Sequence, residues 1–119
     1  MKDSNLDDLS SLKEIDKMIH EPARLMIMSY LYVVESADFL FLMRQTGLTF
    51  GNLSSHMTRL EDVGYIEVEK KFVDKKPNTK LRLTPQGRLA FDDYRRSMSQ
   101  IFSPIEDSKK SVSREGDDI

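Results

Sequence analysis

Hydrophobic positions in the first third of the chain recur at helical spacing. A short amphipathic helix is predicted over about 9–19, where apolar residues lie three or four positions apart: Leu9, Leu12, Ile15 and Ile19. Pro22 interrupts this pattern and suits the first turn of a new helix, where its missing N–H would be unpaired anyway. This second helix is predicted over about 22–35 from apolar residues with the same period: Ala23, Met26, Ile27, Tyr30, Leu31 and Val34.

Two further helical patterns follow, each with its own start signal. Asp38 is placed to cap a short helix over 39–45, and Gly47 can adopt the left-handed conformation that ends such a helix. Thr49 can cap a third helix, predicted over 50–63. The side of this helix that we expect to face the core carries Phe50, Leu53, Met57 and Leu60.

An alternating pattern replaces the helical one after residue 64. Residues 65–69 alternate apolar and charged side chains, which is typical of a strand with one buried face, and Leu81 and Leu83 alternate with basic residues in the same way. Between these stretches, residues 74–78 carry the turn signals Asp-Lys-Lys-Pro-Asn. The pattern therefore predicts a hairpin with a basic tip.

A last helix is predicted to start at Thr84 and Pro85. Its apolar residues step by three, four and three positions, which is typical of a helix–helix seam, and we expect them to form a dimer contact: Phe91, Tyr94, Met98 and Ile101. Beyond Phe102 the chain becomes polar and charged, a composition that buries too little surface to offset the entropy of ordering. We therefore expect a flexible N-terminal segment with the start of the first helix (1–12), one domain (13–102) and a disordered tail (103–119).

Composition excludes several classes of protein. The sequence has no cysteine, no apolar run of about 18 residues and an acidic, polar N-terminus. We therefore expect no disulfides, no membrane insertion and no secretion, and we expect the protein in the cytoplasm. Paired carboxylates, a nucleophile with its base and a glycine-rich phosphate loop are not found in the sequence, so we expect no enzymatic activity.

Charge is distributed unevenly along the chain. The formal net charge is −2, yet residues 65–84 hold six basic residues against three acidic ones, a local charge of +3. Such a run is either a solvated strand edge, where lysine discourages aggregation, or a surface that binds phosphates. The candidates for contacts with a nucleic-acid backbone are Lys70, Lys71, Lys75, Lys76 and Lys80.

The order of the predicted elements favours the second interpretation. Two helices, a glycine turn, a third helix, a basic hairpin and a last helix are the order of a winged helix-turn-helix. This α+β fold has a three-helix core and a β-hairpin wing, here with N- and C-terminal helices for dimerisation. The helix 50–63 would enter the major groove, and the candidates for its groove face are Thr49, Asn52, Ser55, His56 and Arg59. For His56, packing against a neighbouring element is the alternative.

Several stretches also resemble one family of proteins. Residues 48–57 (LTFGNLSSHM) and 59–66 (RLEDVGYI) are similar to the recognition helix and first wing strand of winged-helix transcriptional regulators related to the MarR and ArsR groups. Shorter stretches agree, at 19–25, 70–72, 77–79 and 83–88. The resemblance spans about residues 15–100. It implies a homodimer that binds a pseudo-palindromic operator in double-stranded DNA and regulates transcription.

The same resemblance leaves some partners open. Metal-sensing ArsR proteins use Cys or clustered His and carboxylates, whereas this chain has no Cys and only two histidines, His20 and His56. We therefore expect no metal and no other cofactor, and leave open whether a small-molecule effector is sensed. Winged helices also bind proteins through the same surfaces, so a protein–protein interaction module without direct DNA binding is the second hypothesis.

Overall fold

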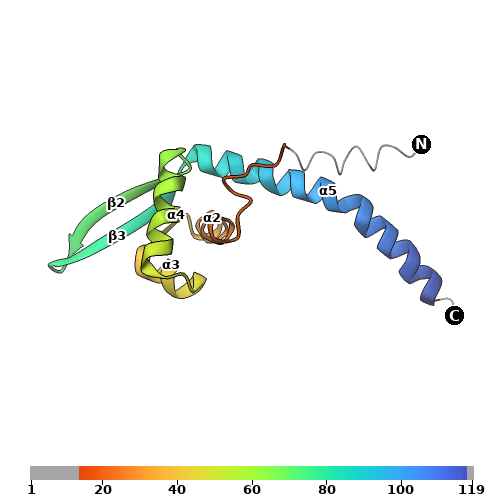
Figure 1. Cartoon of the computed structure of the whole chain (residues 1–119), viewed down its shortest axis with the longest axis horizontal. Coiled ribbons are helices and arrows are strands. Elements are labelled where there is room, and N and C mark those ends of the chain that lie inside the picture. Colours follow the sequence, from red (N-terminus) through yellow and green to blue (C-terminus); the bar gives the residue numbers. More distant parts are fainter. Residues whose placement is uncertain (1–13, 118–119) are drawn as a thin grey trace. The chain divides into compact units, whose positions relative to one another are not determined.

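The structure, a computed structural model, describes residues 14–117, with side chains as far as residue 105. Residues 16–92 form one compact unit and residues 93–117 belong to a second, and each is described by itself. The elements of the described range, labelled in Figure 1, are α2 (Pro22–Val34), β1 (Ser36–Asp38), α3 (Phe39–Thr46), α4 (Phe50–Asp62), β2 (Ile66–Val73), β3 (Lys76–Leu83) and α5 (Pro85–Asp117). Within this range no helix is long and apolar enough to cross a membrane. The α+β class and the predicted order of helices and hairpin are confirmed.

The helix α2 begins where the sequence predicts, because the residues at its start suit a helix N-terminus. The Glu21 side chain accepts a hydrogen bond from the backbone N–H of Arg24 at 2.8 Å, and Pro22 occupies the first turn. The helix ends at Val34, and Glu35 follows with a φ of 71°. Along its length α2 contacts α3, α4 and β3, so it is the central helix of this unit.

The short helix α3 also matches its prediction closely. It ends in Gly47, which has the left-handed φ of 73° expected of a C-terminal glycine. Asp38 occupies the N-cap position, but its side chain makes no capping hydrogen bond. The core that α3 helps to form contains completely buried leucines from three helices and one strand: Leu31, Leu42, Leu53, Leu60 and Leu81.

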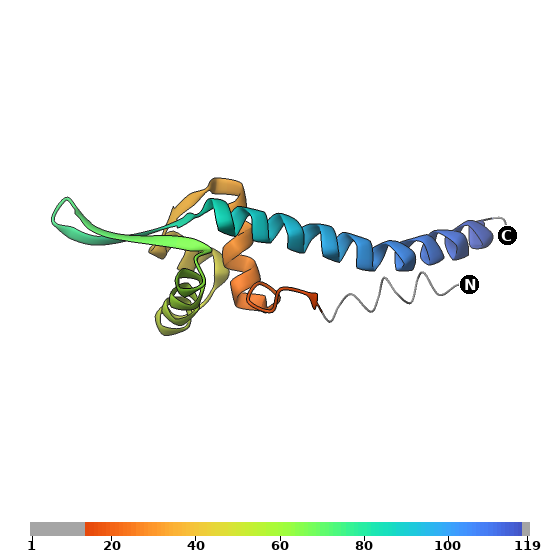
Figure 2. The same ribbon diagram turned by 90° about the horizontal axis from the view of Figure 1, so that it is seen from above.

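Three antiparallel strands form the sheet, in the order β1–β3–β2. The β2–β3 hairpin, which we call the wing, pairs Ile66 with Leu83 at its base and Val73 with Lys76 at its tip. Figures 1 and 2 show that the wing extends well past α4. The strand β1 was not predicted, because a strand of three residues depends on its partner β3 and not on a pattern of its own.

The turn of the wing is tighter than the sequence predicts. Asp74 and Lys75 alone separate the two strands, and their φ angles of 51° and 67° fit a two-residue turn of type I′. Pro77 and Asn78, predicted as turn residues, instead lie in β3 and pair with residues of β2. A primed turn matches the twist of the flanking strands, which explains why pairing continues to the tip.

The helix predicted over 9–19 is wrong at its C-terminal end, and residues 9–13 lie outside the described range. Residues 17–19 form a turn. Oxygen Oδ1 of Asp16 accepts hydrogen bonds from the backbone N–H groups of Met18 at 2.9 Å and Ile19 at 3.2 Å. Local hydrogen bonds of this kind compete with a helix for the same backbone groups. Ile19 is nevertheless completely buried.

The other carboxylate oxygen of Asp16 connects this turn to the sheet. Oδ2 accepts a hydrogen bond of 2.6 Å from the hydroxyl of Tyr65, the residue before β2. Burial, this hydrogen bond and the charge of Asp16 together raise the pKa of Tyr65 to about 12. The phenol therefore keeps its proton in the folded chain over a range of pH in which a free tyrosine ionises.

We expect Tyr65 to make the folded chain sensitive to alkaline pH. Between pH 10 and about 12 the unfolded chain has lost the phenolic proton while the folded chain retains it, so the free energy of unfolding falls as pH rises. Tyr65→Phe removes this titration and should give a shallower decline in the same window. Denaturant unfolding of both proteins at several alkaline pH values measures the difference. Equal slopes would show that another group is responsible.

The helix α5 starts as predicted and extends further than predicted. The Thr84 hydroxyl accepts a hydrogen bond from the N–H of Gly87 at 2.9 Å and donates one to the carbonyl of Gly64 at 2.6 Å. The helix continues through Asp117, although the polar composition beyond Phe102 led us to expect a disordered tail. Glu, Lys and Arg are frequent in residues 103–117. Because such side chains lose little rotamer freedom in a helix, polarity alone does not end one.

Candidate nucleic-acid interface

The two sides of α4 differ sharply in exposure. The buried side consists of Leu53, Met57 and Leu60. The opposite side is open to solvent and consists of Asn52, Ser55, Thr58, Arg59 and Asp62. At the start of the helix, the exposed Thr49 accepts a hydrogen bond from the N–H of Asn52 at 3.2 Å, so the predicted cap is confirmed. Asn52, Ser55 and Arg59 thus lie on one exposed face that begins at a capped helix end.

The first turn of α4 is open to close approach by another molecule. Gly51 is exposed, and a Cβ atom at this position would meet no heavy atom within 4 Å, so packing inside the chain does not require a glycine. The first N–H groups of a helix carry partial positive charge and lack partners within the helix. A helix start of this form can bring its backbone N–H groups to a phosphate oxygen.

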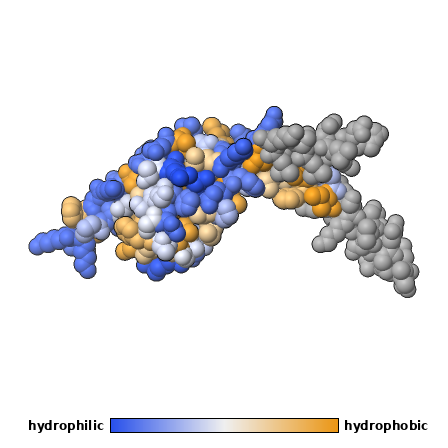
Figure 3. All heavy atoms as spheres, viewed as in Figure 1, coloured by the Kyte–Doolittle hydropathy of each residue, from blue (hydrophilic) through white to orange (hydrophobic). Residues whose placement is uncertain are grey.

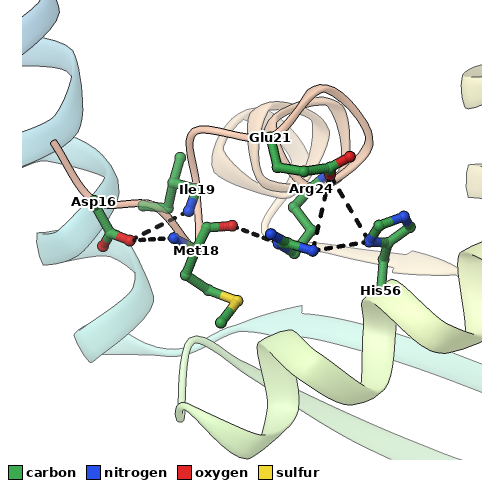
Figure 4. A network of polar contacts seen from close by, with 6 residues as sticks. All are labelled: Asp16, Met18, Ile19, Glu21, Arg24 and His56. Carbon is green, nitrogen blue, oxygen red and sulfur yellow. Dashed lines mark hydrogen bonds and ion pairs between the residues drawn. The ribbon is translucent and has the colours of Figure 1, made fainter.

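His56 lies at the margin of this face and is turned toward the chain itself (Figure 4). Its Nδ1 atom is 3.1 Å from Nη1 of Arg24 and 3.8 Å from Oε1 of Glu21. In this geometry the guanidinium donates and the imidazole Nδ1 accepts, which places any ring proton on Nε2. Of the five residues proposed for the groove face, His56 is the one that is half-buried. Packing against a neighbouring element, the alternative considered from sequence, describes its position.

Arg24 is the centre of this network and is only 7% exposed. Its Nε atom donates a hydrogen bond of 2.6 Å to the carbonyl of Met18, and Figure 4 shows the guanidinium between the turn before α2 and the helix α4. Among the described residues, Arg24 is the buried charged side chain. The network therefore fixes α4 against the turn and α2, and in this way it positions the exposed face.

The wing presents its lysines in different environments. Lys70, Lys75 and Lys76 are exposed, whereas Lys80 is half-buried. Lys71 forms an ion pair with Glu69, with 3.6 Å between Nζ and Oε1. Within the described part of the chain, no carboxylate lies that close to the ammonium groups of the three exposed lysines. The tip of the wing is thus the part of the hairpin with the most accessible positive charge.

The turn at the tip holds a lysine in a conformation that favours glycine. Lys75 has a φ of 67°, in the left-handed region where a side chain costs about 1 kcal/mol or more and glycine costs nothing. Type I′ turns prefer Asn-Gly or Asp-Gly, and here the second residue is a lysine. Lys75 therefore holds an exposed charge at a position where glycine would be less strained.

Comparison with known proteins agrees with this geometry. A family model described as a winged helix DNA-binding domain matches residues 23–102. The chain belongs to this family. A curated relative, an uncharacterised protein from Methanocaldococcus jannaschii, is 32% identical over 90 residues, which is 76% of this chain and 98% of that protein.

Two solved structures share the winged helix. A transcriptional regulator homologue from Pyrococcus horikoshii OT3 is 27% identical and matches 87% of this chain and 95% of its own, with a TM-score of 0.66. A MarR-family transcriptional regulator from Silicibacter pomeroyi is 17% identical and matches 95% of this chain and 77% of its own, with a TM-score of 0.55. The latter likeness concerns the fold alone. The winged helix inferred from the sequence is confirmed, and a MarR-family regulator is among the proteins that share it.

The four residues proposed for dimerisation lie on the winged helix's last helix, α5. Phe91, Tyr94 and Ile101 are buried in the single chain, and Met98 is half-buried. The Phe91 ring lies 5.0 Å from the Tyr32 ring, centroid to centroid. Their dimer role stays a prediction. Within residues 93–105, the large apolar side chains that α5 exposes are Phe102 and Ile105.

The candidate interface also has an apolar part that was not predicted from the sequence. Phe50 was expected to face the core, but it is 66% exposed because the first turn of α4 extends beyond the core. Leu40 and Phe72 are also largely exposed. The sequence held one signal for Phe72: it stands an even number of residues from Ile66, and so on the same face of the strand, but beyond the part that the helices cover.

Proposed function

We propose that this winged helix is a sequence-specific, DNA-binding transcriptional regulator. The helix α4 enters the major groove, and the wing contacts flanking phosphates or the minor groove. The observation that carries the proposal is the combination of one exposed polar face on α4 with a wing whose tip holds unpaired lysines. Membership of a family of DNA-binding domains supports binding as the activity in place of catalysis.

The residues of α4 suit different parts of a DNA site. Arg59 can pair with the two acceptors of guanine, and Asn52 with the donor and acceptor of adenine, in the major groove. Thr49 and Ser55 suit phosphates or either kind of base edge. Because His56 contacts Arg24 within the chain, we assign the contacts with base edges to Arg59 and Asn52.

We further propose that the protein acts as a homodimer on a pseudo-palindromic operator. The exposed face of α4 holds a single arginine, so one subunit neutralises few phosphates and gains little affinity from charge alone. A second subunit doubles this contribution and adds a second half-site. Phe102 and Ile105, three residues apart on α5, offer apolar surface for such a contact. Light scattering of the full chain tests this, and a monomeric mass at the concentrations that bind DNA would contradict it.

We expect the wing lysines to determine how DNA binding depends on salt. Lys75→Gln and Lys76→Gln together remove two charges from the tip and should flatten the slope of log K against log salt concentration by about two units per subunit. Both side chains are exposed, so the fold should be unaffected. Fluorescence anisotropy with a labelled random-sequence duplex at several salt concentrations measures the slope.

Two single substitutions serve as controls for this measurement. Lys17→Gln removes an exposed charge from the turn before α2 and should leave the slope unchanged. Arg59→Ala should also keep the slope nearly unchanged. On a duplex selected from a random pool, however, it should weaken binding by about 1–3 kcal/mol, because the contact with one base pair is lost. If the parent protein shows no salt-dependent binding, the DNA proposal fails and the protein-interaction hypothesis is favoured.

A further inference from the structure

An apolar groove lies between the start of α4 and the inner face of the wing. It has a volume of about 230 Å³, and its walls come from α3, α4 and β3: Phe39, Leu40, Phe50, Pro77, Asn78 and Thr79. The Phe50 ring packs against the ring of the buried Phe39, with 5.0 Å between ring centroids, and most of the Phe50 side chain is exposed to solvent. Leu40 beside it is 57% exposed. Large apolar side chains gathered in this way are typical of a binding surface.

Phe72 extends this groove outward along the wing. It pairs with Pro77 across the hairpin, and directly opposed residues of an antiparallel pair share one face. Pro77 lines the groove, so Phe72 stands on the same face, where it is 74% exposed. Figure 3 shows hydrophobic surface beside hydrophilic surface on the projecting wing. The next residue pair on this face, closer to the base of the wing, is Lys70 with Thr79.

We propose that this groove holds the sugar–phosphate strand that runs between the two grooves of bound DNA, with Phe50 and Phe72 packed against its deoxyribose rings. The proposal rests on the proposed function, because α4 in one groove and the wing in the next leave a single backbone strand between them. Sugars and phosphates take half or more of the hydrogen bonds in protein–DNA interfaces, and they carry no sequence information directly.

The chemistry of the groove matches the alternation along such a strand. Its apolar walls suit sugar rings, while its edges suit phosphates. On one side lie the open N–H groups at the start of α4, and on the other lies Lys70 on the same face as Phe72. The adjacent tip adds Lys75 and Lys76, whose charge attracts the same polyanion. These cations make a nucleic acid a better occupant than an apolar helix of a protein.

Apolar packing and charge neutralisation differ in their dependence on salt. Counterion release makes the lysine contribution fall as salt rises, whereas burial of apolar surface does not depend on released counterions. A contact made by Phe72 with sugar rings should therefore change the affinity by the same factor at every salt concentration. This gives the phenylalanines a signature that the lysines lack.

The experiment compares the full chain with Phe72→Ser, Phe50→Ser and Phe72→Leu on a labelled random-sequence duplex at four salt concentrations. Each serine variant is expected to bind about tenfold more weakly at every concentration, with the salt slope of the parent. Phe72→Leu keeps an apolar side chain and should retain most of the affinity. Val33→Ser, at an 80% exposed position on α2, is the matched control and should bind like the parent.

The other outcomes separate the inference from the proposed function. If the parent binds DNA and both serine variants match Val33→Ser, the groove proposal is overturned while DNA binding stands. A flattened slope in Phe72→Ser would also overturn it, since the residue would then act by placing lysines. If the serine variants change the mass of the free protein and not its affinity for DNA, the groove is a contact between protein chains. If the parent does not bind DNA, both proposals fail.

Discussion

Gly87→Ala is expected to lower the free energy of unfolding by about 3 kcal/mol. A Cβ atom at Gly87 would lie 2.1 Å from the carbonyl oxygen of Tyr65, far inside contact distance. This oxygen cannot move freely, because it accepts a hydrogen bond of 3.1 Å from the N–H of Thr84. The same turn is held by the hydroxyl of Thr84, which bonds to Gly64 and Gly87. The start of α5 would have to move away from the chain that leads into β2.

The matched control for this prediction is the same substitution in another helix. Gly51→Ala adds a methyl group where no heavy atom lies within 4 Å, and the position is exposed. It should stabilise the protein by about 0.5–1 kcal/mol, because alanine loses less backbone freedom in a helix than glycine. Denaturant unfolding of both variants gives the comparison. Equal denaturation midpoints for Gly87→Ala and the parent would show that the backbone at Tyr65 can move away from the added methyl group with little loss of stability.

The features that could be predicted from sequence are those that depend on neighbours in the chain. Pro22 and Thr49 start helices, and Gly47 ends one, because each satisfies or releases backbone groups within four residues of itself. The polar face of α4 follows from the helical period alone, so Asn52 and Arg59 were placed on the exposed side correctly.

The features that could not be predicted depend on partners far along the chain. In the sequence, Arg24 looks like an ordinary surface residue of an amphipathic helix. Its buried side chain contacts His56, thirty-two positions away. The strand β1 exists because β3 pairs with it. Phe50 fits the apolar period of α4, but only the full fold shows that the core stops short of its first turn. The hydrophobic period shows which side of a helix faces the core, but not how far along the helix the core extends.

Arg24→Met is expected to lower the free energy of unfolding by about 2–4 kcal/mol. Methionine retains the apolar stem of the side chain, so the loss comes from the guanidinium. Without it, the carbonyl of Met18 loses a donor at 2.6 Å, and Nδ1 of His56 loses one at 3.1 Å. Glu21 keeps its bond to the backbone N–H of residue 24 and loses the nearby positive charge.

A control of the same chemistry is available on α3. Arg44 is exposed, and Arg44→Met should change the stability by no more than about 0.5 kcal/mol. Thermal and denaturant unfolding of the two variants measure the difference between a buried and an exposed guanidinium. If both variants unfold at the same denaturant concentration, water or a neighbouring side chain must replace the guanidinium of Arg24 without cost.

A double-mutant cycle tests whether Arg24 acts through His56. Because their nitrogen atoms are 3.1 Å apart, Arg24→Met and His56→Ala should be non-additive, and the double variant should lose about 0.5–2 kcal/mol less than the sum of the single losses. His56→Ala should reduce stability and leave the preferred base sequence of the folded protein unchanged, since the imidazole is turned toward Arg24. Loss of DNA affinity without loss of stability would instead place His56 on the base-reading face, where its position in the helical period first put it.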